Sequence, residues 1–243
     1  YMKLADAHLH FAAEPAGLGE TLARAGVTRA FLNATGVADW AAVLTEAKNP
    51  AITAFIGIHP WYCREHEPAA LTELDKLLAK FPQAQVGEIG LDRVIDTPLP
   101  LQEEFFAAQL RLAAKHNRVV CVHCVKAWDR VIGLIKREGP PPRGFILHGF
   151  SGPENLMPEL TALGAYFSFG PRILSPRENK QTALVKATPK NRVLCETDFP
   201  YGKINGMVPS VPPISEVTAA VAEAAGLEPR KLYENAMKII GVL

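Results

Sequence analysis

The sequence has few cysteines, no long apolar run and almost no net charge, and each absence excludes a class of protein. Four cysteines in 243 residues are too few for the disulfide framework of a small secreted domain, so we expect reduced thiols. No apolar stretch reaches the roughly 18 residues that a transmembrane helix needs. The residues before His8 lack the basic and apolar segments of a signal peptide, and we therefore expect a cytoplasmic protein.

Neither sign of charge is in excess, which removes one argument about partners. The chain carries 26 Lys and Arg against 25 Asp and Glu, a formal net charge of +1. Non-specific binding to nucleic acid is dominated by a strongly basic field, and the composition provides none. The composition therefore neither favours nor excludes a nucleic-acid substrate.

Short β-branched or aromatic runs alternate with longer helical patterns along the chain. The helical pattern is clear over residues 101–116, where Phe105, Gln109 and Leu112 recur at three- or four-residue spacing. Strand followed by helix, repeated, indicates a mostly parallel sheet. The eight expected strands cover residues 3–8, 29–34, 52–57, 85–89, 119–123, 145–147, 166–169 and 193–196.

Eight such repeats favour one α/β architecture, the closed (β/α)₈ or TIM barrel. A doubly wound open sheet usually has five or six strands and a Gly-x-Gly-x-x-Gly turn after the first. Here the first expected strand is followed by His8-Leu9-His10 instead. We therefore expect a single barrel domain over residues 1–243, with the irregular segment 199–213 overhanging its mouth.

Histidines and acids gather at the C-terminal ends of the expected strands, the face where barrel enzymes keep their active sites. His8 and His10 stand two residues apart, so the two-residue period of a strand points both imidazoles into the barrel. Glu88 ends the fourth strand, where glycines at 87 and 90 permit close approach of the backbone. Its two carboxylate oxygens could bridge two cations.

Three further strand ends supply the same kinds of ligand. The candidate metal ligands are His8, His10, Glu88, His123, His148 and Asp198. This set can hold two divalent ions (Zn²⁺, Mn²⁺ or Mg²⁺), and the number of imidazoles favours Zn²⁺ or Mn²⁺. Two ions roughly 3.5–4 Å apart would activate a shared water for hydrolysis, with Asp198 as its base. Each residue alone has an ordinary explanation as a core or capping group, and the agreement among five strands argues for one site.

Two more residues are expected beside this set. His59 follows the third strand and could bind a phosphate or stabilise charge in the transition state, or it could simply fix the loop. We group it with Glu88 and Asp198 as a candidate catalytic residue. Glu196 should face the same interior as Asp198, where it is expected to orient a histidine ligand.

Several segments of the chain, in one order, resemble the TatD family of metal-dependent hydrolases. The resemblance spans nearly the whole chain and implies phosphodiesterase activity, with many members described as deoxyribonucleases and DNA as the expected partner. It also implies that Glu88 bridges two ions, one held with His8, His10 and Asp198 and the other with His123 and His148. The segments are Asp6-Ala7-His8-Leu9-His10, Gly57-Ile58-His59-Pro60, Gly87-Glu88-Ile89-Gly90-Leu91-Asp92, Val122-His123, His148-Gly149-Phe150-Ser151-Gly152, Glu196-Thr197-Asp198-Phe199-Pro200-Tyr201 and Asn235-Ala236.

One departure from the family pattern concerns phosphate binding. The family usually shows a Ser-Arg-Asp or similar run after the fifth-strand histidine, whereas Cys124-Val125-Lys126-Ala127-Trp128 stands here. Lys126 or Arg172 could supply the missing positive charge, although lysine lacks the planar fork of arginine. The candidate substrate-binding residues are His59, Lys126, Arg172 and Tyr201.

Two aspects of function stay open at the level of sequence. Trp61, Tyr62 and Tyr201 could stack on a planar group, although packing of the mouth is the more ordinary explanation. The same metal-activated water could attack a carboxylic ester or amide in place of a phosphodiester. A metal-binding scaffold without turnover is a third reading, against which a retained Asp198 argues.

Overall fold

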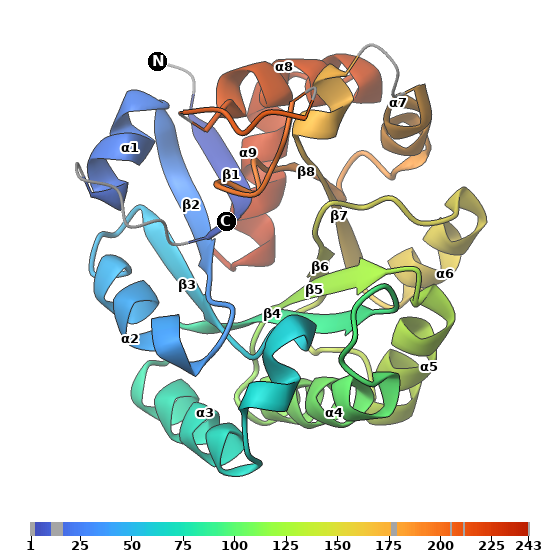
Figure 1. Ribbon diagram of the computed structural model, residues 1–243. Helices are drawn as coiled ribbons and strands as arrows, with labels where there is room; N and C mark the ends of the chain where they lie inside the picture. Colours follow the sequence, from blue (N-terminus) through green and yellow to red (C-terminus); the bar gives the residue numbers. More distant parts are fainter. Residues whose placement is uncertain (1–2, 11–16, 176–178, 205, 211, 243) are drawn as a thin grey trace.

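A ring of parallel strands surrounded by helices forms the protein, as the computed structural model in Figure 1 shows. The structure describes residues 3–10, 17–175, 179–204, 206–210 and 212–242. Within these residues eight strands pair in chain order, each parallel to the next. The strands are β1 (Leu4–His10), β2 (Val27–Asn33), β3 (Ile52–Ile56), β4 (Gln85–Asp92), β5 (Val120–Val125), β6 (Phe145–Leu147), β7 (Ala165–Phe169) and β8 (Val193–Cys195).

Hydrogen bonds between β1 and the chain that follows β8 close the ring. The backbone N–H of Asp198 donates to the carbonyl of His8 at 2.9 Å, and that of His10 donates to the carbonyl of Phe199 at 2.8 Å. The first and last strands are thereby joined at the end that carries the histidines. The prediction of a (β/α)₈ barrel is confirmed.

Helices cover the outside of this ring, and one of them closes the end of the barrel at which the strands begin. Met237, Ile239 and Ile240, from α9 and its C-cap, form one buried cluster with the barrel residues Phe31 and Ile146. The N-terminal end of the barrel is therefore filled with apolar side chains. The helices are α1 (Leu18–Arg24), α2 (Val37–Glu46), α3 (Ala69–Lys80), α4 (Leu99–Lys115), α5 (Trp128–Glu138), α6 (Met157–Ala162), α7 (Asn179–Ala187), α8 (Ile214–Ala225) and α9 (Pro229–Ile239).

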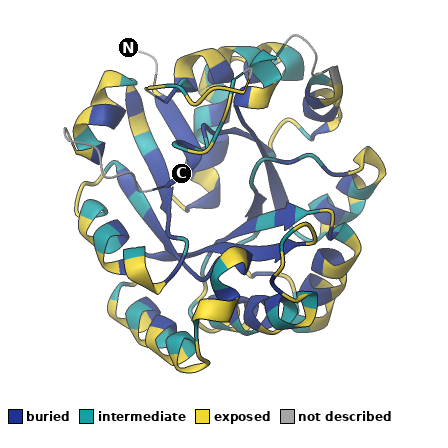
Figure 2. Cartoon of the chain, in the orientation of Figure 1, coloured by how far each residue is buried: buried dark blue, intermediate teal, exposed yellow. Residues whose placement is uncertain are grey.

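The outer helices bury one face against the strands. In α4 the apolar side chains Phe105, Phe106 and Leu110 are buried, whereas Glu104 before them and Arg111 after them are exposed. Figure 2 shows the same division throughout the molecule, with buried strands and exposed outer helix faces. None of the helices within the described residues is long and apolar enough to cross a membrane.

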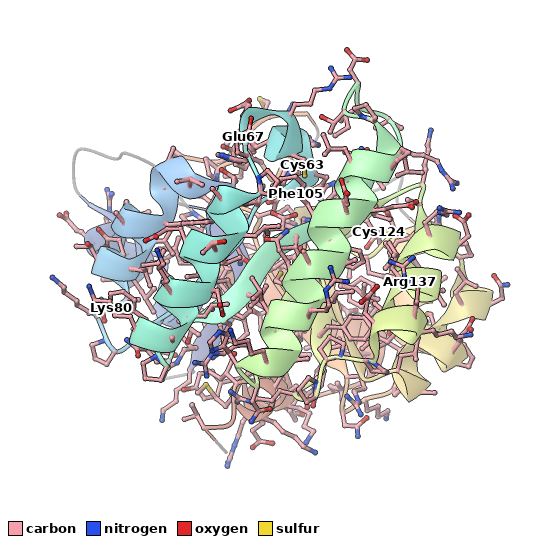
Figure 3. The ribbon with its side chains drawn as sticks, turned by 90° about the horizontal axis from the view of Figure 1, so that it is seen from below. Cys63, Glu67, Lys80, Phe105, Cys124 and Arg137 are labelled. Atoms are coloured by element: carbon pink, nitrogen blue, oxygen red, sulfur yellow. The ribbon has the colours of Figure 1, made fainter. Side chains whose placement is uncertain are left out.

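The helices run back from the C-terminal ends of the strands towards their N-terminal ends. In Figure 3 Cys63 and Glu67, which precede α3, lie at one end of the molecule, and Lys80 at the end of α3 lies towards the other. Cys63 belongs to a short 3₁₀ helix, η1 (Pro60–Glu65), in the loop that follows β3. Loops of this kind, which follow the strands, surround the mouth where the side chains of interest converge.

The observed boundaries differ from the expected ones chiefly at that mouth. β1 continues to His10 and β4 to Asp92, whereas the sequence predicted ends at residues 8 and 89. Both strands are prolonged because they keep pairing, Leu9 with Leu32 and Gly90 with His123. The segment after β8 does overhang the mouth (Figure 1), although positions 205 and 211 of it lie outside the described residues.

Candidate metal centre

Six side chains from distant parts of the sequence meet at the C-terminal mouth of the barrel. Five of them are buried or nearly so, and the Asp198 side chain is 28% exposed. The structure therefore brings together all six residues that the sequence singled out as metal ligands. They are His8 and His10 on β1, Glu88 on β4, His123 on β5, His148 directly after β6 and Asp198 after β8.

The carboxylate of Glu88 lies at the middle of this cluster and faces two sets of imidazoles. Its Oε2 atom is 3.4 Å from Nε2 of His8 and 3.3 Å from Nε2 of His10. Its Oε1 atom is 2.9 Å from both Nδ1 of His123 and Nε2 of His148. One carboxylate thus has one oxygen towards each pair of histidines.

The cluster has two halves, each with a pair of imidazole nitrogens at ligand spacing. In the β1 half, made by His8, His10 and Asp198, the two Nε2 atoms are 3.0 Å apart and lie 3.7 and 3.5 Å from Asp198 Oδ1. In the β5–β6 half, Nδ1 of His123 and Nε2 of His148 are 3.2 Å apart. Two nitrogens that share a tetrahedral ion at about 2.0–2.1 Å would lie about 3.3 Å from each other.

In the β1 half, neutral groups hold the outer nitrogens of the histidines. Nδ1 of His10 donates to the carbonyl of Asn33 at 3.1 Å, which leaves the Nε2 lone pair directed into the cluster. Nδ1 of His8 is 3.2 Å from Sγ of Cys121. Burial, together with the negative charges of Glu88 and its neighbours, raises the pKa of this thiol well above its ordinary value, so the sulfur is uncharged.

In the β5–β6 half, carboxylates lie next to the outer nitrogens of the histidines. Nε2 of His123 is 3.3 Å from Oδ2 of Asp92, and Nδ1 of His148 is 3.4 Å from Oε1 of Glu196. A carboxylate partner favours a proton on the outer nitrogen and directs the inner lone pair towards Glu88. The sequence predicted such a role for Glu196 but not for Asp92.

The cluster fits cations better than it fits a closed hydrogen-bond network. Oε1 of Glu88 is buried and lies close to imidazole nitrogens of His59, His123 and His148, but none of these contacts has hydrogen-bond geometry among the described residues. Imidazole lone pairs that face carboxylate oxygens repel each other unless positive charge lies between them. Imidazole and carboxylate together suit Zn²⁺ or Mn²⁺. Among the described residues three overlapping groups have ligand atoms within 4.8 Å of one another, namely His8, His10 and Asp198; His8, Glu88 and His148; and His59, Glu88 and His123.

The two carboxylates in contact with the inner nitrogens are ionised. Burial by itself raises the pKa of Glu88, but the interaction with the surrounding histidines, His148 foremost, outweighs it and holds that pKa well below the ordinary range. Burial is also outweighed at Asp198, whose pKa is lowered by its hydrogen bond with His10 and by nearby histidines. Both groups are therefore available as anionic ligands.

His59 lies at the edge of the cluster with a different hydrogen-bond pattern. Its Nδ1 accepts a hydrogen bond from the backbone N–H of Trp61 at 3.2 Å, because His59 caps the 3₁₀ helix η1. Burial lowers the pKa of His59 to about 4, so the ring is neutral. The proton must then sit on Nε2, which lies 3.4 Å from Oε1 of Glu88. This tautomer makes His59 a hydrogen-bond donor to the site rather than a metal ligand.

Two glycines allow the strands that carry Glu88 and His123 to approach closely. A Cβ atom at Gly90 would lie 1.9 Å from the carbonyl oxygen of His123, and the φ angle of Gly90 is +149°. A Cβ atom at Gly87 would lie 2.8 Å from Cβ of Cys121. Any other residue at these positions would push β4 and β5 apart, so the spacing between Glu88 and His123 depends on both glycines.

Asp6 ties the two chain segments of the β1 half together, a contact that sequence reasoning missed. Its Oδ1 accepts from the backbone N–H groups of His8 at 3.3 Å and Thr197 at 3.0 Å, and its Oδ2 accepts from the Thr197 hydroxyl at 2.5 Å. Burial raises the pKa of Asp6 to about 7. The signal was available, because a buried acid two residues before His8 on a strand faces the same interior and needs a partner.

Two cavities adjoin the cluster and share part of their lining, with His123, His148, Asp198 and Tyr201 in both. The larger has a volume of 470 Å³ and is lined by Arg172, Lys203 and Gln181 as well as by ligand candidates. The smaller has a volume of 140 Å³, and its walls are largely aromatic. Its aromatic and imidazole lining residues are His10, His59, Trp61, Tyr62, His123, His148 and Tyr201.

Three of the four expected substrate-binding residues therefore lie at the cavities. His59 lines the smaller one, Arg172 the larger one and Tyr201 both. Lys126 is exposed and is not among the described residues that line either cavity. Its role stays a prediction, and Lys203 supplies a positive charge that the sequence did not single out.

Fold and cluster together define a class of protein, a (β/α)₈ barrel with a histidine- and carboxylate-rich centre at its C-terminal mouth. A family profile described as TatD related DNase matches residues 5–240. The chain belongs to this family, as the sequence motifs predicted.

Individual relatives agree with this assignment. YjjV of Escherichia coli K12, described as an uncharacterized metal-dependent hydrolase, is 32% identical over 210 residues, which cover 83% of this chain and 81% of YjjV. The crystal structure of YjjV, described as a TatD homolog, matches with a TM-score of 0.88 at 30% identity and covers 97% of both chains. A Klebsiella pneumoniae protein named 3′-5′ ssDNA/RNA exonuclease TatD is 36% identical over 149 residues, 60% of this chain and 56% of its own.

Proposed function

We propose that the protein is a two-metal phosphodiesterase that hydrolyses DNA or RNA strands. The observation that carries the proposal is the position of Glu88, whose two carboxylate oxygens each face one pair of imidazole nitrogens. The name of the K. pneumoniae relative, a single-strand DNA and RNA exonuclease, supports the choice of substrate. When bound, two divalent ions would lower the pKa of a shared water and neutralise charge on the phosphoryl group.

The charges around the cluster support the binding of cations. Four carboxylates contact its histidines, and within the described residues they pair only with histidines and with no lysine or arginine. Their summed formal charge of −4 requires positive charge at the cluster, which bound divalent cations would supply. Buried charges require such compensation. The four carboxylates are those of Glu88, Asp92, Glu196 and Asp198.

Asp198 is the group placed to accept the proton of the attacking water. Its side chain is more exposed than those of the other five residues of the cluster, and it lines both cavities. The backbone N–H groups of Tyr201 and Gly202 donate to its carbonyl at 2.7 and 2.6 Å, which fixes the turn that carries it. A fixed carboxylate at the junction of the cavities can take up a proton without moving.

The residues around the cluster fit the charge of a phosphodiester. Arg172 and Lys203 in the larger cavity would bind the phosphates of the strand, and Arg172 can do so with two parallel hydrogen bonds. From the smaller cavity, the Nε2–H group of His59 would donate to a phosphoryl oxygen. A positive charge from the β7 loop thus takes the place of the arginine that the family pattern has after the β5 histidine.

The proposal is tested by measuring bound metal and then hydrolysis with Zn²⁺, Mn²⁺ and Mg²⁺ supplied in turn. Substrates are single-stranded and duplex DNA, single-stranded RNA, a p-nitrophenyl phosphodiester and p-nitrophenyl acetate. We expect about two ions per chain and turnover of the phosphodiesters that a chelator abolishes. Turnover of the carboxylic ester alone would replace the proposed substrate class, and bound metal without any turnover would indicate a scaffold.

A further inference from the structure

Trp61 is a large aromatic side chain that stays half exposed beside the metal cluster. Its side chain lines the smaller cavity and is 52% exposed, whereas Trp40 is buried. An exposed tryptophan offers a large flat apolar face on which a planar group can stack. It comes directly after Pro60 in η1, so the same short helix presents His59 and Trp61 to the site.

The structure holds this exposed ring in one orientation. The indole Nε1–H group donates to Oδ2 of Asp92 at 2.8 Å, and the side chain of Asp92 is only 2% exposed. Asp92 is itself held by the backbone N–H of Val94 at 3.0 Å and lies 3.3 Å from His123. The ring of His59 packs against the indole at a centroid distance of 5.3 Å and nearly perpendicular to it. One buried carboxylate therefore positions both an inner residue of the cluster and an aromatic surface at its rim.

We infer that Trp61 is the residue that recognises the base of the nucleotide beside the scissile bond, by stacking on its ring. This inference rests on the proposed phosphodiesterase activity and names the part of the substrate that the smaller cavity receives. A pre-oriented aromatic ring stacks on any of the bases, because every base has a π face. Trp61 therefore sets a requirement for a base without selecting which one.

The opposite character of the two cavities decides which part of the strand each one takes. The larger cavity carries Arg172 and Lys203 and suits the phosphates of the continuing strand. The smaller cavity has no lysine or arginine among the described residues that line it, and Trp61 and Tyr62 form part of its wall. Glu88 and His123 also line the smaller cavity, so a base placed there would be attached to the phosphate at the cluster.

The experiment compares three single-stranded DNA oligonucleotides, one unmodified, one with an abasic residue at its 3′ end and one with an abasic residue at its 5′ end. Each is assayed with the metal-loaded protein for kcat and KM, and with the chelator-treated protein for binding. The variants are Trp61→Ala, Trp61→Phe and, as a control at the same mouth, Val37→Ala, whose side chain is 38% exposed and lines neither cavity within the described residues. The binding measurement requires no hydrolysis, so the inference is tested even where the proposed activity fails.

We expect Trp61→Ala to raise KM and Kd for the unmodified strand about tenfold, within the range of one lost base–aromatic stack. For one of the two abasic strands the same variant should change neither value. Trp61→Phe keeps a ring and should recover most of the affinity, and Val37→Ala should match the parent protein. The inference is overturned if Trp61→Ala affects all three strands equally, affects none of them, or lowers kcat with KM and Kd unchanged.

Discussion

The two halves of the centre contain similar inner residues but are supported by different chemistry. The β1 half draws both histidines from one strand, backs them with the Asn33 carbonyl and the Cys121 thiol, and adds Asp198. In the β5–β6 half the histidines come from two elements and are backed by the carboxylates Asp92 and Glu196. Glu88 directs one carboxylate oxygen to each half.

The difference shows two ways of supplying negative charge to a cation site. In the β1 half the carboxylate is itself a candidate ligand, and it is exposed enough to act on a water. In the β5–β6 half the two carboxylates stand behind the imidazoles and act through them, which makes a histidine a stronger ligand. We therefore expect the β5–β6 half to act mainly as a fixed site and the β1 half to carry the proton transfer.

Replacing Glu88 should have the largest effect, because it removes what the two halves share. We expect Glu88→Gln to lower bound metal in both halves and to reduce kcat/KM by about a thousandfold or more, since both of the proposed ions would contribute to the reaction. Metal analysis of the purified variant and the hydrolysis assay measure this. Glu104→Gln, an exposed glutamate on α4, is the matched control and should leave both quantities unchanged. Retention of two ions by Glu88→Gln would contradict a bridging role.

Asp198→Asn should come next and should affect the halves unequally. The amide cannot accept the proton of water at neutral pH, so we expect kcat to fall by about 10²- to 10⁴-fold. Metal titration should show weaker binding in the β1 half and nearly unchanged binding in the β5–β6 half. Equal weakening of both halves would remove the distinction between them.

The fold was predictable because its signals are local. β6 has the predicted bounds, since its three apolar residues stand between a glycine at 144 and the polar His148. The ends of β1 and β4 were not predictable to the residue, because their last pairs depend on neighbouring strands. Closure of the ring by hydrogen bonds between Asp198 and His8 likewise joins residues far apart in the sequence.

The inner residues of the site were predictable for a topological reason, and their supports were not. Three of the inner residues end or follow a strand: His10 ends β1, and His148 and Asp198 come after β6 and β8. The other three, His8, Glu88 and His123, lie within their strands, and in a barrel the C-terminal parts of all strands meet at one mouth. What lies behind each imidazole depends on how far neighbouring strands are staggered. The Asn33 partner of His10 is a backbone carbonyl with no signature in the sequence, and the contact between Cys121 and His8 joins opposite parts of the barrel.

Asp92→Asn and Glu196→Gln test the supports of the β5–β6 half and should have intermediate effects. Each replaces a carboxylate behind a histidine with a neutral amide of similar shape. We expect metal affinity in this half to fall about 10- to 100-fold, with smaller changes in the β1 half. Competition with a chromophoric chelator measures both affinities. A larger loss in the β1 half would reverse the proposed division of roles.

Cys121→Ala should have the smallest effect, and it tests a group that supports a histidine in the β1 half. The thiol is a weak hydrogen-bond partner of His8 at 3.2 Å, and its loss leaves the His8 ring packed against the His148 ring at a centroid distance of 4.0 Å. Weak contacts of this kind are worth about 0.5–1 kcal/mol, so we expect metal affinity in the β1 half to change by about two- to fivefold. The same chelator competition measures this change in affinity. Cys63→Ala is the control, because Cys63 lies in η1 and lines neither cavity within the described residues. A loss as large as that of Asp92→Asn would mean that a neutral thiol supports a ligand as strongly as a carboxylate, and the contrast between the halves would then lie in Asp198 alone.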